Sequence, residues 1–347
     1  MAQAVWATRN SYHRRPTTSP WQALRSWAST LQKKKIVFWF YVGVWVAHGL
    51  LIYGAKDTSG QQSFSPTAVV FLTECCKLVV ASTMFLTNDY DSQQGLPEGW
   101  KKLLVLYMVP ALLYSIYNNL TFVCLSLLDP STYFILMQLR IPVTGLVWQR
   151  LFKKTLSRQQ WVAIFFITIG CAVKDARNFG GMNGITPATC LLVTGQMSLT
   201  VVAGVYTEYL LKGYKGMTTN LQNIFMYVDS MVVNVAIMLV KTATAMASAE
   251  MSGFSVAAVL GVISNPIAVA IVLNGACLGI STGYFLATLD SPRKAIASAL
   301  EIVFTSLISF AAFGTDLGLF SVISVIMVST GVFYYTQPPP AAVIKTD

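Results

Sequence analysis

The stretch DPSTYFILMQLRIPVTGLVWQRLFKK, residues 129–154, places an arginine in the middle of an apolar segment long enough to cross a membrane. It begins with a helix-start signal, Asp129-Pro130-Ser131, and ends in a cluster of basic residues. A charge at mid-bilayer is costly, so such a residue usually faces a cavity or a partner. We therefore expect Arg140 to line a cavity inside a helical bundle.

The composition of the whole chain also indicates a membrane protein. Of its 347 residues, 54% are hydrophobic and only 11% are charged, whereas soluble domains carry about 25% charged residues. Apolar stretches of about 20 residues recur along the chain, and each is long enough to span a bilayer. We predict an all-α polytopic membrane protein with ten transmembrane helices, at 36–55, 66–86, 103–125, 131–149, 158–174, 188–211, 220–243, 264–288, 292–313 and 317–335.

These spans define the domain organisation. Residues 1–35 are polar and basic without any acid, and we expect them to be a cytosolic tail rather than a cleavable signal peptide, because no apolar core precedes the first span. We expect residues 36–335 to form one ten-helix domain, with halves at 36–174 and 188–335, and 336–347 to form a cytosolic C-terminal tail. With this orientation almost all of the basic excess lies in cytosolic segments. The net charge of +10 thus orients the chain in a lipid bilayer, and we expect no nucleic-acid partner.

The sequence contains no motif of an enzyme or a metal site. The six cysteines lie in apolar segments without CxxC spacing, and two histidines are too few for a histidine-based site. A Walker loop, HExxH and GxSxG are all absent. We therefore predict no catalysis, no cofactor and no metal.

The ten spans divide into two similar halves. Asp129 and Asp290 open the fourth and ninth spans, and Gly170 and Gly331 lie near the ends of the fifth and tenth, both pairs 161 residues apart. Five spans are an odd number, so the two halves would be inverted across the bilayer. In such transporters the substrate site lies between the repeats near the midplane.

The same offset relates the charged residues of the fourth and ninth spans. Tyr133 corresponds to Lys294, and Arg140 corresponds to Glu301. Tyr133 and Arg140 are seven residues apart, as are Lys294 and Glu301, so each pair would share one helix face toward a common axis. We hypothesise that Glu301 partly neutralises Arg140 in the empty protein; the alternative is a buried packing pair without a functional role.

Other polar residues within the spans have two interpretations. Glu74 and Lys77 lie three residues apart, which favours pairing within the helix over contact with a substrate. Tyr117, Asn118 and Asn119 make the third span polar at its centre. These side chains could form hydrogen bonds with the base or sugar of a substrate, or with neighbouring helices.

The eighth span carries Asn274 followed by Gly275, Gly279 and Gly283. Glycines at four-residue spacing allow another helix to approach closely, so we interpret this stripe as packing rather than binding. Asn274 itself is a candidate substrate-binding residue.

Two fixed positive charges beside tyrosine and asparagine side chains favour a compact anion, and phosphate matches the arginine fork. The residues therefore indicate a carrier for an organic phosphate, with Arg140 and Lys294 as ligands. An exchanger of another organic anion is the second interpretation. A membrane scaffold or sensor that retains the fold without transport is a third, from a different class.

Several stretches resemble the nucleotide-sugar transporters of the UDP-galactose/CMP-sialic acid branch, within the drug/metabolite transporter superfamily. The resemblance spans nearly all of residues 36–335 and rests on TECCK (73–77), YNNLTFVCLSLLDPSTYFILMQLR (117–140), LSRQQW (156–161), GVYTEYLLKG (204–213), LQNIFMY (221–227) and LNGACLG (273–279). It implies exchange of a cytosolic nucleotide sugar, with a UDP-sugar favoured, for a lumenal nucleoside monophosphate. It also implies a Golgi membrane, in preference to the endoplasmic reticulum, and leaves a homo-oligomer open.

The resemblance also implies roles for individual residues. The phosphate-holding lysines of the family correspond to Arg140 and Lys294, and other substrate-binding positions correspond to Asn118, Asn119, Tyr133, Gln138, Tyr206 and Asn223. The chain departs from the family pattern at four positions, where it has Tyr117, Arg140, Gln222 and Glu301.

Overall fold

The computed structural model describes residues 20–55, 64–90, 98–128, 130–176, 186–214, 216–247, 256–314 and 318–337. The chain divides into a short N-terminal unit, residues 1–36, and a large unit, residues 37–347. The predicted tail is helical from Pro20 onward as the start of α1 (Pro20–Gly54). Asp129, residues 1–19 and most of the C-terminal tail lie outside the described residues.

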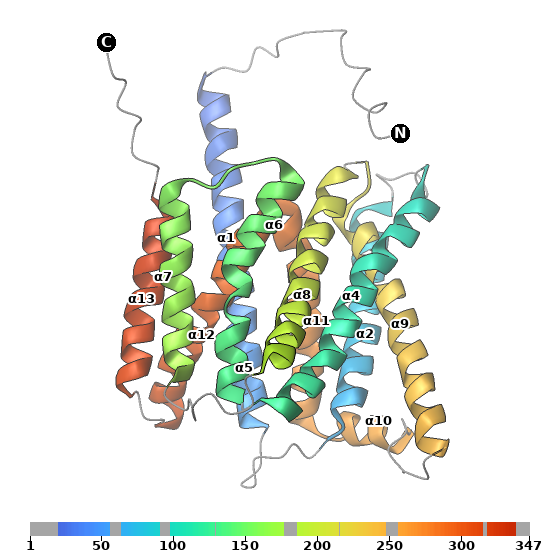
Figure 1. The fold of residues 1–347 in the computed structure, drawn as a ribbon. Coiled ribbons are helices and arrows are strands. Elements are labelled where there is room, and N and C mark those ends of the chain that lie inside the picture. Colours follow the sequence, from blue (N-terminus) through green and yellow to red (C-terminus); the bar gives the residue numbers. More distant parts are fainter. Residues whose placement is uncertain are drawn as a thin grey trace, which may run out of the picture. The chain divides into compact units, whose positions relative to one another are not determined.

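The described residues are helical, without strands (Figure 1). After α1 the helices are α2 (Pro66–Asn88), α4 (Trp100–Leu127), α5 (Pro130–Met137), α6 (Arg140–Phe152), α7 (Arg158–Asp175), α8 (Pro187–Gly213), α9 (Thr219–Ala247), α10 (Val256–Ile263), α11 (Pro266–Thr288), α12 (Ser291–Phe313) and α13 (Leu319–Thr336).

Local sequence explains where many helices begin. A polar capping residue begins α2, α8, α11 and α12, and its side chain accepts a hydrogen bond from a free N–H of the first turn. Proline follows at the first position in α2, α8 and α11 and at the second in α12, where it has no N–H that needs a partner. Asp290 is such a cap for α12, accepting from the N–H of Arg293 at 2.9 Å. The predicted eighth span begins instead at Pro266, because Asn265 caps α11 there and α10 is a separate short helix.

The predicted fourth span is interrupted, and this determines where Arg140 lies. Pro142 has no N–H to donate to the carbonyl of Gln138, which accepts from Ile141 instead, at 3.1 Å. The N–H of Gln138 is shared between the carbonyls of Phe134 and Ile135, at 3.2 Å each. These tighter turns separate α5 from α6, and Arg140 becomes the first residue of α6.

Seven helical segments are long and apolar enough to cross a membrane: Leu31–Ile52, Ala68–Asn88, Trp100–Leu125, Pro187–Gly213, Pro266–Thr288, Ser291–Ala311 and Leu319–Thr336. Each coincides with one of the ten predicted spans. The remaining three predictions fall on α5 with α6, on α7 and on α9. α5 and α6 are each too short alone, and α7 has three charged residues among its 18.

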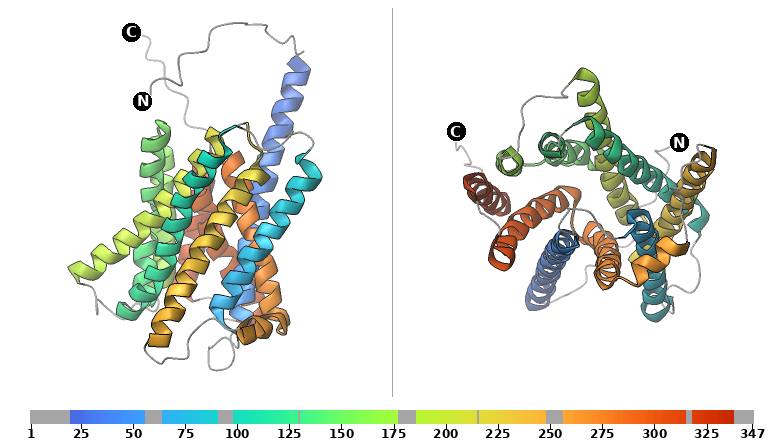
Figure 2. Two further views of the ribbon diagram at one scale, coloured as in Figure 1. Left: turned by 90° about the vertical axis from the view of Figure 1, so that its right-hand side faces the viewer. Right: turned by 90° about the horizontal axis from the view of Figure 1, so that it is seen from below.

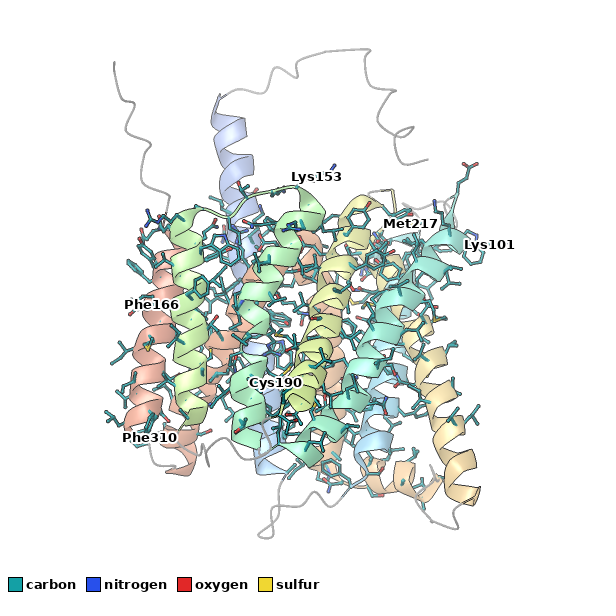
Figure 3. All side chains as sticks on the ribbon, viewed as in Figure 1. Lys101, Lys153, Phe166, Cys190, Met217 and Phe310 are labelled. Atoms are coloured by element: carbon teal, nitrogen blue, oxygen red, sulfur yellow. The ribbon has the colours of Figure 1, made fainter. Side chains whose placement is uncertain are left out.

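The distribution of side chains is that of a membrane protein. Large apolar side chains project outward, including Phe166 at 47% exposure and Phe310 at 50% (Figure 3). Polar side chains such as Gln196, Glu208 and Gln222 are buried. Since soluble proteins rarely expose large contiguous apolar patches, this outer surface suits lipid.

In the large unit, α7 packs on α13, α2 on α9, and α4 on α8 (Figures 1 and 2). Two glycines bring α7 and α13 together. A β-carbon on Gly170 would lie 2.9 Å from the Val328 side chain, and one on Gly331 would lie 2.6 Å from the Ile167 side chain. Ile167 and Val328 are also 161 residues apart, the same spacing as Gly170 and Gly331.

Candidate functional site

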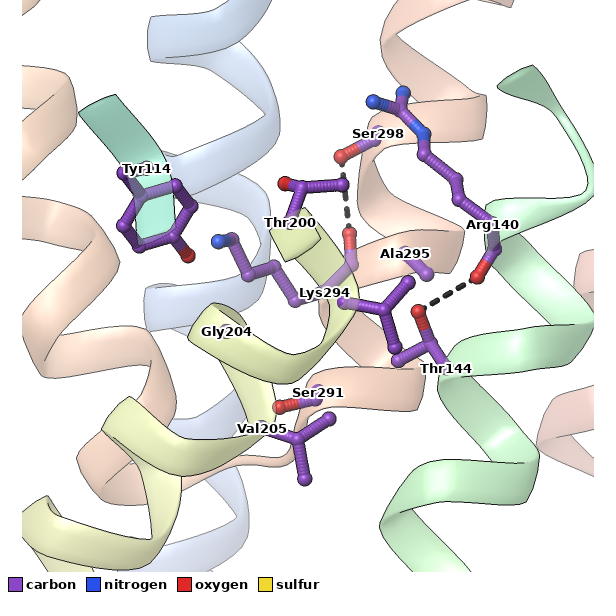
Figure 4. Close-up of a pocket in the computed structure, with 11 residues that line it drawn as sticks. Tyr114, Arg140, Thr144, Thr200, Gly204, Val205, Ser291, Lys294, Ala295 and Ser298 are labelled. Atoms are coloured by element: carbon purple, nitrogen blue, oxygen red, sulfur yellow. Dashed lines mark hydrogen bonds between the residues drawn. The ribbon is translucent and has the colours of Figure 1, made fainter. Parts of the chain in front are cut away.

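A cavity of about 90 Å³ lies among α4, α6, α8 and α12 (Figure 4). Both predicted phosphate ligands, Arg140 and Lys294, line it. The remaining lining residues are Tyr114, Thr144, Thr200, Val201, Gly204, Val205, Ser291, Ala295 and Ser298. The structure thus brings together the two cations that lie 154 residues apart in the sequence.

The backbone holds each cation near the start of a helix. Arg140 begins α6, where its carbonyl accepts from the Thr144 hydroxyl at 2.6 Å. Lys294 lies in the first turn of α12, where its N–H donates to the Asp290 carbonyl at 3.0 Å. In Figure 4 the Lys294 ammonium points toward Tyr114, and the Arg140 guanidinium lies on the side of Ser298.

Neither Arg140 nor Lys294 has an ion-pair partner among the described residues. The ion pairs in this part of the chain are Glu74–Lys77, Glu208–Lys212 and Asp290–Arg293. No acidic residue lines the cavity. Two uncompensated positive charges in a low-dielectric interior attract an anion strongly. The cavity therefore offers an anion site.

The predicted pairing of Glu301 with Arg140 is not observed. The Glu301 carboxylate accepts from the Thr305 hydroxyl at 3.1 Å. The same oxygen would lie 3.1 Å from a β-carbon on Gly49 of α1. Glu301 and Arg140 therefore form no ion pair, although their charges interact over a longer distance. Glu301 does not line the cavity.

The prediction that Tyr133 and Arg140 lie on one continuous helix is wrong. The seven-residue spacing assumed such a helix, but α5 ends at Met137 and α6 begins at Arg140. The Tyr133 hydroxyl accepts from the Gln196 amide at 3.0 Å, away from the cavity. Gln138 is also buried, at the interruption itself.

A second cavity of about 480 Å³ lies among α1, α2, α4 and α11. Its polar lining consists of His48, Thr73, Glu74 and Asn118. Asn118 follows Tyr114 by one turn of α4, so this helix contributes to both cavities. A volume of this size is typical of small-molecule sites, which measure about 300–1,000 Å³.

Glu74 and Lys77 pair within α2, as their spacing predicted, at 2.6 Å. The Lys77 ammonium also lies 4.9 Å from the centre of the Tyr227 ring. One oxygen of Glu74 is buried without a hydrogen bond among the described residues, although the carboxylate borders the second cavity.

Three other candidates have structural contacts outside both cavities. Asn119 donates to the Ser115 carbonyl at 2.9 Å, one turn earlier in α4. Tyr117 packs against the cluster around Tyr133, and its carbonyl accepts from Gln196. Tyr206 packs among apolar residues and stacks on a neighbouring tyrosine of α8.

The glycine stripe of α11 packs closely, as predicted. Gly275 lies against Thr73 and Gly279 against Lys77. Gly283 lies against the amide of Asn223, which is buried and makes no hydrogen bond among the described residues. Asn274 donates to the Val44 carbonyl at 3.2 Å.

Glu208, which accepts four hydrogen bonds beside the first cavity, was not among the predicted site residues. One oxygen of Glu208 accepts from the Trp148 indole at 3.1 Å and from Lys212 at 2.6 Å. The other accepts from the N–H of Ser291 at 2.7 Å and from its hydroxyl at 2.6 Å. The spacing to Lys212 was visible in the sequence, but the partners on α6 and α12 were not.

A sequence model of the family described as "Nucleotide-sugar transporter" matches residues 30–336. The UDP-galactose transporter senju of Drosophila melanogaster is 32% identical, over 88% of this chain and 86% of that protein. CMP-sialic acid transporter 3 of Arabidopsis thaliana is 30% identical, over 76% of this chain and 66% of that protein. A solved crystal structure superposes with a TM-score of 0.62 at 15% identity, over 88% of this chain and 96% of the other, which shows a shared fold.

Proposed function

The chain belongs to the nucleotide-sugar transporter family, and we propose that it exchanges a cytosolic nucleotide sugar for a lumenal nucleoside monophosphate across the Golgi membrane. A UDP-sugar is the favoured substrate, because the relative that matches over most of both chains is named a UDP-galactose transporter. The site would open to one side of the membrane and then to the other, and such transport requires no catalysis.

The observation that carries the proposal is the pair of uncompensated cations in the first cavity. Arg140 offers a planar fork and Lys294 a point charge, and both suit phosphate oxygens. A nucleoside monophosphate and a nucleotide sugar share this phosphate chemistry, so one site can hold either in turn.

The second cavity suits the organic part of the substrate. The first cavity, at about 90 Å³, is too small for a whole nucleotide sugar. α4 contributes Tyr114 to the first cavity and Asn118 to the second, at about 480 Å³. A substrate lying along α4 would place its phosphate between the cations and its base or sugar against Asn118 once the surrounding helices part.

Ten spans in two inverted repeats complete the proposal. Helix pairs from equivalent positions of the two halves pack on each other: α2 on α9, α6 on α12, and α7 on α13. The reciprocal glycine contacts of Gly170 and Gly331 agree with this relation. Rocking of one half against the other would expose the central site to each side alternately.

Purified protein in proteoliposomes provides the test. Vesicles loaded with UMP, CMP or GMP are offered labelled nucleotide sugars, and we expect uptake only with the matching internal monophosphate. Arg140→Ala and Lys294→Ala should each abolish uptake. Arg158→Ala and Lys102→Ala remove exposed cations outside both cavities and should leave it unchanged.

Absence of exchange with every nucleotide, in protein that remains folded, would contradict the carrier proposal. That outcome would instead favour a membrane scaffold or sensor that keeps the fold.

A further inference from the structure

The carboxylate of Glu208 joins the two helices that carry the cations. Glu208 lies on α8 and is fully buried. Its contact with Trp148 reaches α6, which carries Arg140 two turns earlier. Its contacts with Ser291 reach the first residue of α12, which carries Lys294 within the same turn. A single side chain therefore bridges both halves of the anion site.

The start of α12 needs such an acceptor. The first N–H groups of a helix have no partner within it. Pro292 has no N–H, and the N–H of Arg293 donates to the Asp290 side chain. The remaining N–H, that of Ser291, donates to Glu208. A carboxylate at this end of the helix is also favoured by the helix dipole.

Lys212 completes the connection. It pairs with Glu208 one turn earlier on α8 and donates to the carbonyl of Leu289, just before α12 begins. Lys212 forms the direct ion pair with the buried carboxylate, and Glu208 forms none with Lys294 or Arg140 among the described residues. The pair instead holds the segment from Leu289 to Ser291 against α8.

We propose that Glu208 is a positioning residue, which sets the spacing between Arg140 and Lys294 for the substrate phosphate. It does so from outside the cavity, which it does not line. The proposal rests on the proposed function, because it assigns the phosphate to those two cations. A merely structural tie would stabilise the fold without acting through Lys294.

A double-mutant cycle separates these two roles. Glu208→Gln keeps the shape of the side chain but loses the charge and presents an N–H group to donors. We expect UMP, CMP or GMP, whichever binds wild-type protein most tightly, to bind about ten-fold more weakly. In the Lys294→Ala background the same substitution should cost little further affinity, because non-additivity identifies residues that act together.

Two tryptophans supply a milder variant with a matched control. Trp148→Phe removes the indole donor to Glu208 and should weaken binding in the same direction, to a smaller extent. Trp161→Phe makes the same change on α7, where the indole nitrogen has no hydrogen bond among the described residues, and should leave binding unchanged. If the affinity losses of Glu208→Gln and Lys294→Ala simply add in the double mutant, the proposal is overturned.

Hydrogen exchange tests the positioning without any ligand. The amides of 289–296 should exchange faster in Glu208→Gln than in wild-type protein, while those of α13 remain unchanged. Unchanged exchange at the start of α12 would also overturn the proposal. If wild-type protein binds none of the three nucleotides, the carrier proposal fails, and hydrogen exchange still decides whether Glu208 holds this helix.

Discussion

The site contains an arginine and a lysine with different surroundings. Arg140 begins a helix that starts within the bundle, and Lys294 lies in the first turn of another. Helix N-termini carry a partial positive charge, but at the start of α12 the free N–H groups already donate to Glu208 and Asp290. An anion in the cavity would therefore be held by the Arg140 and Lys294 side chains themselves.

Arginine instead of the family's lysine at position 140 should change how phosphate is held. We expect Arg140→Lys to keep exchange but to weaken nucleotide binding, because a point charge replaces a two-pronged donor. A hydrogen bond to a charged group contributes about 1.5–3 kcal/mol, so the loss should be about ten- to hundred-fold, with a larger loss for Arg140→Ala. Titration of the nucleotide-induced rise in melting temperature measures it. Equal binding by the Arg140→Lys variant would show that only charge matters.

At the scale of elements, the interruption between α5 and α6 decides which residues share the site. Pro142 prevents the regular hydrogen bond at Gln138, and the turn that results places Tyr133 and Arg140 on two different helices. Discontinuous helices in other transporters likewise place half-helix ends at substrate sites. The interruption between α5 and α6 therefore has a local physical cause, which is the missing N–H of Pro142.

Replacement of this proline should restore a continuous helix at the expense of binding. Pro142→Ala returns an N–H to the fourth span, and proline in a helix interior costs about 3 kcal/mol, so we expect unchanged or higher thermal stability. We also expect weaker nucleotide binding, because Arg140 rotates with the straightened helix. Pro266→Ala is the control, since proline at the first position of α11 removes no internal hydrogen bond. Unchanged binding by Pro142→Ala would show that the interruption does not position Arg140.

At the scale of the molecule, we predict the orientation in the membrane from the distribution of charge. Basic residues gather in the segments that the ten-span arrangement places on the N-terminal side, such as 150–158. The exposed surface is apolar over most helices, and the polar side chains are buried between them. Lipid outside and a polar interior are the arrangement that a carrier requires.

This orientation predicts that both termini face the cytosol. In sealed Golgi vesicles, a protease added outside should remove tags from both ends of the chain. A tag inserted between 177 and 185, on the opposite side, should be cut only after detergent opens the vesicles. If the tag at either terminus resists the external protease, the prediction that both termini face the cytosol is wrong.

Much of this protein is determined locally by its sequence. Apolar length, proline and capping side chains act within a few residues, so most helix starts and the Glu74–Lys77 pair were predictable. The start of α1 at Pro20, the division of the fourth span into α5 and α6, and the separate α10 were not predicted. The two cations were also predictable, because a charged side chain is costly within an apolar span and is usually retained only where it lines a cavity or meets a partner.

Tertiary structure alone decided which polar residues meet. Glu208 reaches Trp148 and Ser291 across 60 and 83 residues of sequence, and Glu301 lies beside Gly49 without an ion pair to Arg140. Such contacts depend on how distant helices pack and on the interruption that divides α5 from α6. Periodicity within a single helix carries no information about either, which is why the charges were found from sequence and their partners were not.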